Sequence, residues 1–548
     1  MTRRSLLSET LLVALFLACV AAVVLASYIR HGGFYSDDWA NAAYYRLADP
    51  PRYWSSVEEL HRTLGGRPLL ALLLPIPHAL LGVHPALQLA LAAGLGVATS
   101  LCVYVLLRTL ALGPLDAGAV ATLVLLFPWA DSVRLWPTAS MNTLSVCFFL
   151  VGLTIALRGL DRRGAAALVR HGTAVTLYVA SVLTYEVTAA AALLAGALYL
   201  HRGDRVAALR RWAVDVLAIG GALAYSLATT VTARHVGTLA DRVHDLRTFG
   251  RECVLLFASA LVPAGPADAI GKGLAVAVLA AAVVLLAVRA ARRGDAELRF
   301  WATVAAGAVV AVAAAEFMFL GSFLHPLDPG VGNRANVFAA IGYCLLAYAV
   351  VRAAARLVAR RGAATALAAV LAAAIATGYG YRVHSDAAAW ARAARVQRDV
   401  VAAVDASGVR LSRSDAVLTF GAPAEVKPGV PVFDRSWDLA GALQLRTGFL
   451  SLRGFPVYEG VIVRCARRGV VVSGPGSYGT AFARYGSAVF VEVPARRAVR
   501  PRDERRCRTS SRQLARSALA SSSRSRARKK LRPSIAAGSP PPSASMRR

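Results

Sequence analysis

Long apolar runs dominate this chain and limit what it can fold into. Windows long enough to cross about 30 Å of hydrocarbon are centred near residues 16, 97, 150, 222, 279, 311, 344 and 372. Shorter apolar windows lie at 116–130, 171–184 and 187–200, and 57% of the 548 residues are hydrophobic. This pattern predicts an all-α polytopic membrane protein.

The charged residues indicate which ends of these segments face the cytoplasm. The chain has 62 Lys and Arg against 31 Asp and Glu, a formal net charge of +31. The basic residues lie in short clusters between apolar segments, which is typical of cytoplasmic loops and does not indicate a nucleic acid partner. With a cytoplasmic N-terminus, the clusters on the cytoplasmic side lie around Arg108, Arg158 to Arg170, Arg202 to Arg211, Arg289 to Arg299 and Arg352 to Arg361.

This topology depends on how three segments are interpreted. Residues 5–27 are longer than the apolar part of a signal peptide, so we expect an uncleaved first helix. Residues 67–82 contain prolines and His78, which make a poor spanning helix, so we expect that they do not cross. Residues 171–200 must form a hairpin of two short helices with Tyr185 and Glu186 at its outer tip, because basic loops flank both ends. The prediction is about 11 transmembrane helices and an extracytoplasmic C-terminus.

The sequence pattern changes near residue 382. Short β-rich runs such as "DAVLTF", "VIVRC", "GVVVSG" and "SAVFVEVP" predict a small extracytoplasmic α/β domain over 382–497, after a transmembrane domain over 1–381. Residues 498–548 are rich in Arg, Ser and Pro, and we expect a disordered basic tail. The seven cysteines show no zinc spacing or disulfide framework. The abundance of Ala, Arg, Gly and Val is typical of a GC-rich bacterial genome, and we expect a protein of the bacterial plasma membrane.

The segment "HGGFYSDDWANAAYY", residues 31–45, puts Asp37 and Asp38 just beyond the first apolar run. Two carboxylates facing one cavity raise each other's pKa, and one could then act as a general base near neutral pH. Adjacent side chains on an extended segment point in opposite directions, so one acid would transfer the proton while the other orients a group or binds a cation. The spacing fits equally well a pair that caps a short interfacial helix beginning at Trp39.

Several motifs, "YSDDW" above all, resemble the GT-C superfamily of polytopic glycosyltransferases. The others are "GRPLLALLLPIPHALLG", "FPWADSVRLWPTASMN" at 127–142, "LTYE" at 183–186 and "HPLDPGVGNRANVF" at 325–338. The resemblance covers about residues 5–380. It implies a GT-C-like fold and an inverting transfer of a sugar from a polyprenyl-phosphate donor to an acceptor outside the cytoplasm. It favours Asp37 as the general base and Asp38 as its partner, but leaves the division of roles between them open.

A donor of this kind needs cations for its phosphate, because the leaving group gains negative charge as the glycosidic bond breaks. Arg334 is the first candidate, and snorkelling to the lipid headgroups is its alternative explanation. The full set of expected donor-phosphate residues is Arg334, Asn333, His325, Arg134 and Lys272.

Other residues have less specific expectations. Glu186 and Asp131 would line the cavity or make structural polar contacts, and Glu186 would pair with a basic residue such as Arg134. Trp39 would stack on a sugar ring or belong to an interfacial aromatic belt. No cofactor is predicted with certainty, although Asp37 or Asp38 could bind a divalent metal with waters.

The expected partners are the lipid bilayer, a polyprenyl-phosphate-linked sugar, and a cell-envelope glycan, lipid or protein acceptor. Two other classes of function fit a chain of this kind. A transporter or flippase of a lipid-linked saccharide would show internal repeats and polar residues at mid-membrane depth, neither of which is evident in the sequence. A non-catalytic membrane scaffold would keep its function without Asp37 and Asp38.

Overall fold

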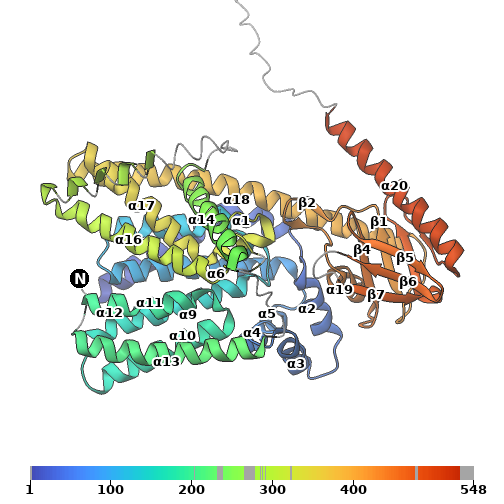
Figure 1. Ribbon diagram of the computed structural model, residues 1–548, viewed down its shortest axis with the longest axis horizontal. Coiled ribbons are helices and arrows are strands. Elements are labelled where there is room, and N and C mark those ends of the chain that lie inside the picture. The colour runs from blue at the N-terminus through green and yellow to red at the C-terminus, as the bar shows by residue number, and fades with distance from the viewer. Residues whose placement is uncertain are drawn as a thin grey trace, which may run out of the picture. The chain divides into compact units, whose positions relative to one another are not determined.

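The computed structural model describes residues 3–530 except 203, 231–238, 264–277, 280, 284, 287, 291, 321, 323 and 475–478. The chain divides into two compact units (Figure 1). The first, which we call the helical unit, contains residues 1–395 and 425–433. The second, the C-terminal unit, contains residues 396–424 and 434–548.

Among the described residues, eight helices are long and apolar enough to cross a membrane. These stretches are Leu7–His31, Pro85–Thr109, Ser140–Leu160, Ala165–Thr184, Arg205–Thr229, Ala296–Phe317, Ala339–Val358 and Gly362–Ala406. They belong to α1 (Arg3–His31), α6 (Pro85–Thr109), α9 (Ser140–Leu160), α10 (Ala165–Thr184), α13 (Arg205–Thr229), α16 (Ala296–Phe317), α17 (Ala339–Val358) and α18 (Arg361–Ala406). The prediction of a membrane protein agrees with this, whereas the count of 11 is not reached, partly because the window near residue 279 lies largely outside the described residues.

Other elements, all but α14 shorter than the eight helices, join them. They are α2 (Asp37–Leu47), α3 (Arg52–Leu64), α4 (Pro68–Leu73), α5 (Ile76–Leu81), α7 (Pro114–Leu126), η1 (Pro128–Ala130), α8 (Ser132–Leu135), η2 (Glu186–Thr188), α11 (Ala189–Leu194), α12 (Gly196–Arg202), α14 (Leu239–Leu261) and η3 (Gly330–Val337). Residues 67–82 form two helices of six residues each, both with proline in the first turn, so neither is long enough to span. The helix α10 ends at Thr184, which places a break at Tyr185 and Glu186 as expected.

The helices α6, α9, α10 and α13 pack in sequence, with α9 between α6 and α10 and α13 on the other side of α10 (Figure 1). On the last part of the bundle, α16 packs along α17, and α17 contacts α7. The segments between α7 and α9 and between α16 and α17 contain short 3₁₀ turns that contact each other, η1 with η3. These turns place polar side chains next to the ends of the apolar helices.

The C-terminal unit contains a four-stranded sheet in the order β4-β1-β8-β9, formed by β4 (Arg453–Val457), β1 (Ala416–Phe420), β8 (Ala488–Glu492) and β9 (Arg497–Val499). The strand β1 runs parallel to both β4 and β8 and is buried along its whole length. A buried central strand needs apolar side chains on both faces, which is why "AVLTF" reads as a continuous apolar run. The helix α19 (Ser436–Thr447) packs on β4.

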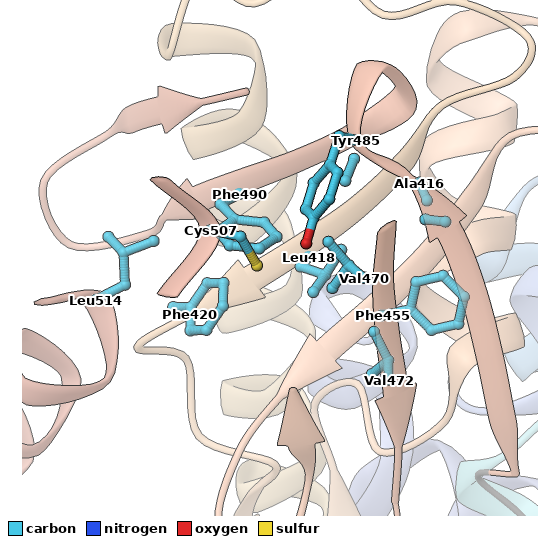
Figure 2. Close-up of a cluster of buried hydrophobic side chains, with 12 residues drawn as sticks. Ala416, Leu418, Phe420, Phe455, Val470, Val472, Tyr485, Phe490, Cys507 and Leu514 are labelled. Carbon is cyan, nitrogen blue, oxygen red and sulfur yellow. The ribbon is translucent and has the colours of Figure 1, made fainter. Parts of the chain in front are cut away.

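A second sheet in this unit is antiparallel, in the order β5-β6-β7, from β5 (Ile462–Ala466), β6 (Gly469–Ser473) and β7 (Thr480–Arg484). Figure 2 shows the buried cluster, in which Phe420 and Phe490 lie near Cys507 and Leu514. The presence of parallel and antiparallel strands with α19 agrees with the predicted α/β domain.

The structure differs from the predicted domain boundaries in three places. The helix α18 continues through residue 381 to Ala406, because its sequence stays rich in Ala and Arg, and the boundary between the units falls after Arg395. The β-hairpin of β2 (Glu425–Lys427) and β3 (Val430–Pro431) belongs to the helical unit.

The third difference lies in the segment predicted to be a disordered tail. Residues Glu504–Lys530 form α20, and a disulfide joins Cys507 on this helix to Cys465 on β5. Cys507 and Leu514 are seven residues apart, so they lie on one helix face, and both are buried in the cluster of Figure 2. Packing of this face and the cross-link stabilise a helix whose composition alone indicated disorder.

Candidate functional site

The two adjacent aspartates begin the helix α2. Asp37 and Asp38 occupy its first turn, after Ser36, where negative charge is favourable against the helix dipole. Asp37 is half-buried, whereas Asp38 is only 1% exposed. The expected short helix is present, but it begins at Asp37 and not at Trp39, so the pair lies in its first turn and Ser36 is the N-cap. Only one of the two carboxylates lies in the protein interior.

Asp38 links two segments that are far apart in the sequence. Its Oδ2 accepts a hydrogen bond from the backbone N–H of Tyr35 at 2.9 Å, and its Oδ1 accepts one from the N–H of Thr138 at 2.8 Å. Burial raises the pKa of the Asp38 carboxyl to about 7, although these hydrogen bonds favour the charged form. Asp38 thus holds the start of α2 against the loop that precedes α9.

The aromatic rings around this pair pack against other aromatic side chains. Trp39 makes an edge contact with Phe34 at 5.5 Å between ring centroids, and a tilted contact with Phe433 at 6.3 Å. Tyr35 lies edge-on to Trp390 at 4.6 Å and donates from its hydroxyl to the Trp390 carbonyl oxygen. Trp39 is half-buried, so part of its surface is open to a ligand such as a sugar.

The segment 127–139, which we call the tryptophan loop, contains η1 and α8 and packs against η3. Asn333 on η3 donates to Asp131 Oδ1 at 2.8 Å and accepts from the N–H of Ser132 at 3.1 Å. Asn336 donates to the carbonyl oxygens of Trp129 and Pro326, each at 2.8 Å. Both asparagines are buried, so we interpret them as residues that join the two segments.

A second pair of carboxylates lies beside this junction. Asp131 is 1% exposed, and both burial and the facing Asp386 carboxylate on α18 raise the pKa of its carboxyl. Asp386 also forms an ion pair with Lys427 of the β2–β3 hairpin. Asp131 was expected from the sequence as a polar contact, whereas Asp386 and Lys427 were not.

Two arginines stack on the tryptophan loop. The guanidinium carbon of Arg334 lies 5.3 Å from the ring centroid of Trp136, and that of Arg382 on α18 lies 4.8 Å from the centroid of Trp129. Arg334 Nη1 also donates to the carbonyl oxygen of Val331 at 2.6 Å. Both arginines are half-buried, so each keeps a partly exposed cation next to an aromatic face.

The other expected phosphate-binding residues lie in different surroundings. Arg134 is 6% exposed, donates to the Phe127 carbonyl oxygen at 2.6 Å, and lies against Gly96 of α6. Burial lowers the pKa of its guanidinium to about 10. His325 Nδ1 lies 3.3 Å from Glu252 Oε2 on α14, and the backbone N–H of His325 donates to Asp328 Oδ2 at 2.8 Å. Lys272 lies outside the described residues.

Glu186 pairs with Arg67. Arg134 was the example of a basic partner expected from the sequence. Arg67 Nη2 lies 2.7 Å from Glu186 Oε1, and Nε lies 2.9 Å from Oε2. The same guanidinium lies 4.4 Å from the ring centroid of Tyr185. Arg67 precedes α4, so this bidentate pair joins the short-helix segment to the break after α10.

Within the described residues, no group of three or more His, Cys, Asp or Glu side chains is arranged to hold a metal ion. Both oxygens of Asp38 already accept backbone hydrogen bonds. Metal coordination by Asp37 or Asp38 therefore stays a prediction from the sequence.

The residues that sequence reasoning missed are Arg67, Arg382, Asp386 and Lys427. Arg382, Asp386 and Lys427 lie in the range predicted for the C-terminal domain, although the structure places the first two on α18 and Lys427 on β2 of the helical unit. Only the spacing of Arg382 and Asp386, four residues apart and therefore on one helix face, gave a signal in the sequence.

Comparisons with known proteins add one structural likeness. No family model matches the chain, and no curated protein matches it. One similar solved structure is the crystal structure of the Archaeoglobus fulgidus oligosaccharyltransferase in complex with Zn and sulfate, with 13% sequence identity and a TM-score of 0.38. The match covers 81% of this chain and 62% of that one, so the chain spans less than two thirds of that protein's length. The function is therefore argued from the chain's own residues.

Proposed function

We propose that this chain is a membrane glycosyltransferase that moves a sugar from a polyprenyl-phosphate donor to an acceptor outside the cytoplasm. One observation carries the proposal: the tryptophan loop joins a carboxylate pair to a half-buried cation. Thr138 of this loop binds Asp38, and Trp136 of the same loop stacks with Arg334. A base and a phosphate-binding cation on one framework are the two groups that this reaction needs. The motifs that resemble the GT-C superfamily include both.

The two aspartates take different roles in this proposal. Asp38 has both oxygens engaged by backbone N–H groups and is buried, which suits a residue that positions the start of α2. Asp37 is the half-buried neighbour at the first position of the helix, and we assign it the role of general base. This assignment agrees with the one that the resemblance favours.

The reaction balances with these groups. The acceptor hydroxyl gives its proton to the Asp37 carboxylate while its oxygen attacks the anomeric carbon of the donor sugar. The bond from that carbon to the phosphate oxygen breaks, and its electron pair leaves with the polyprenyl phosphate. Arg334 stabilises the negative charge that develops on this phosphate. Attack opposite the leaving group inverts the anomeric configuration.

The side of the membrane on which this occurs is also part of the proposal. The disulfide between Cys465 and Cys507 is typical of a protein region in an oxidising compartment. This supports a C-terminal unit outside the cytoplasm, the side that the basic loops assign to Asp37. An acceptor in the cell envelope is consistent with that location.

The test is a transfer assay with purified protein and a panel of polyprenyl-phosphate sugars. Asp37→Asn should lower turnover by about 10²–10⁴-fold, the range for loss of a general base, without changing the melting temperature by more than a few degrees. Asp49→Asn is the matched control, because Asp49 is an exposed acid on the same outer segment, and it should transfer like the wild type. Equal turnover in the wild type and Asp37→Asn would refute the proposed base.

A further inference from the structure

The β2–β3 hairpin, residues 425–433, is the part of the helical unit that comes from farthest along the chain. It belongs with residues 1–395, whereas 396–424 before it and 434–548 after it form the C-terminal unit. Its two short strands pair through Glu425 with Pro431 and Lys427 with Val430. Glu425 closes the turn by accepting from the N–H of Gly429 at 3.1 Å. The hairpin is thus an ordered element with its own internal hydrogen bonds.

The turn of the hairpin fits against the start of η3 without room for a side chain. The carbonyl oxygen of Gly429 accepts from the N–H of Val331 at 2.8 Å. A Cβ added to Gly330 would lie 1.9 Å from that oxygen, and a Cβ added to Gly429 would lie 2.1 Å from the carbonyl oxygen of Pro329. Both glycines have positive φ, +58° and +71°, which also favours glycine at these positions.

This contact leads directly to the candidate phosphate-binding arginine. The N–H of Val331 donates to the Gly429 carbonyl oxygen of the hairpin, and the carbonyl oxygen of Val331 accepts from Arg334 Nη1 at 2.6 Å. A shift of the Gly429 carbonyl would therefore displace Val331, the residue whose carbonyl oxygen binds the guanidinium. Only one residue, Val331, lies between the hairpin and the cation.

Two further contacts link the hairpin to the other parts of the site. Lys427 pairs with Asp386, whose carboxylate faces Asp131, the partner of Asn333 on η3. Phe433 at the end of the hairpin packs on Trp39, the residue next to Asp38. The hairpin therefore reaches η3, α18 and α2, the elements that carry the candidate cation, Asp386 of the second carboxylate pair and the candidate base.

We propose that the 425–433 hairpin is a working part of the transferase site, with Gly429 as the positioning residue for Arg334 and Lys427 as the positioning residue for Asp386. This inference rests on the proposed function, and it gives a segment from within the C-terminal domain sequence a role in sugar transfer. Neither residue touches the reacting atoms in this scheme. They act through η3 and α18.

The first test compares Gly429→Ala with Gly408→Ala in the full chain. Gly408 has the same φ of +71° but no atom within 4 Å of an added Cβ, so the control carries the backbone strain without the clash. With the polyprenyl-phosphate sugar that the wild type uses best, Gly429→Ala should lower kcat/KM for the donor by about 10–100-fold. Gly408→Ala should stay within about twofold of the wild type. Equal kcat/KM for the two variants would overturn the role of Gly429.

The second test separates positioning by Lys427 from a general loss of stability. Lys427→Gln should raise the KM for the donor or lower kcat, and Lys427→Arg, which keeps the charge, should restore most of that loss. If Gln and Arg variants have the same kinetic constants as the wild type while only their melting temperatures fall, the role of Lys427 is structural and the proposal for it is wrong.

Hydrogen exchange distinguishes failure of this inference from failure of the proposed function. The Val331 amide should be protected in the wild type and should exchange at least tenfold faster in Gly429→Ala but not in Gly408→Ala, because only the former displaces its acceptor. If the Val331 amide exchanges at the same rate in Gly429→Ala as in the wild type, the proposed positioning of η3 by the hairpin is wrong. A wild type that transfers none of the sugars would instead refute the proposed function, whatever the exchange result.

Discussion

Asp38 is a buried carboxylate on which two effects oppose each other: its hydrogen bonds favour the charged form, and its burial favours the neutral form. Backbone N–H groups of Tyr35 and Thr138 occupy both of its oxygens. Burial nevertheless raises the pKa of its carboxyl to about 7. Asp37 beside it is half-buried, so two neighbouring acids of one motif lie at different depths in the protein. This difference in burial supports the proposed roles, in which Asp37 acts on the substrate and Asp38 positions the start of α2.

The pKa of Asp38 predicts a pH dependence of stability. Its value rises from 3.8 to about 7 on folding, so the folded protein binds a proton in this range that the unfolded chain does not. The resulting stabilisation is complete below about pH 4 and is lost as pH rises through about 7. Melting temperatures in detergent should therefore fall between pH 5 and pH 8 by more in the wild type than in Asp38→Asn.

A matched variant separates this contribution from that of other acids. Asp131→Asn should remove part of the pH dependence in the same direction, because the pKa of Asp131 is also raised by burial and by Asp386. Asp49→Asn, at an exposed position, should leave the dependence as it is in the wild type. A steeper fall in Asp38→Asn than in the wild type would contradict the assigned pKa shift.

At the scale of elements, sequence reasoning succeeded where a signal was local. Asp37 and Asp38 stood out because adjacent acids follow an apolar helix, and the break at Tyr185 followed from the basic loops on both sides. Asp386 and Lys427 could not be found this way, because the contacts that bring them to Asp131 are tertiary. The helix α20 was missed because low hydrophobicity predicts disorder, although Cys507 and Leu514 have the spacing of one helix face.

The Arg67–Glu186 pair gives a test at this scale, because it joins the segment of α4 to η2. Arg67→Ala should destabilise the helical unit by about 1–3 kcal/mol, since it leaves a partly buried carboxylate without its bidentate donor. Arg62→Ala removes an exposed arginine from its pair with Glu59 and should change stability by no more than about 0.5 kcal/mol. Thermal unfolding in detergent measures both changes in stability. Equal shifts would show that the Arg67–Glu186 pair stabilises the protein no more than the exposed Arg62–Glu59 pair does.

At the scale of the whole molecule, two independent features bear on topology. The basic clusters assign sides to the apolar helices through the positive-inside rule. The Cys465–Cys507 disulfide is typical of a region in an oxidising compartment, which supports the proposed location of the C-terminal unit. The features concern different parts of the chain, and both support the proposal that the C-terminal unit lies outside the cytoplasm. A single labelling experiment can therefore contradict either one.

The experiment uses single cysteines in a chain that keeps Cys465 and Cys507 and has its other cysteines replaced. Arg46→Cys on the outer segment and Arg468→Cys in the C-terminal unit should react with a membrane-impermeant maleimide in intact cells, because both positions are exposed. Arg162→Cys, exposed in a basic loop, should react only after the membrane is made permeable. If Arg468→Cys behaves like Arg162→Cys, the C-terminal unit is cytoplasmic. The compartment inferred from the disulfide would then have to be abandoned, while labelling of Arg46→Cys would still place Asp37, and with it the proposed acceptor side, outside.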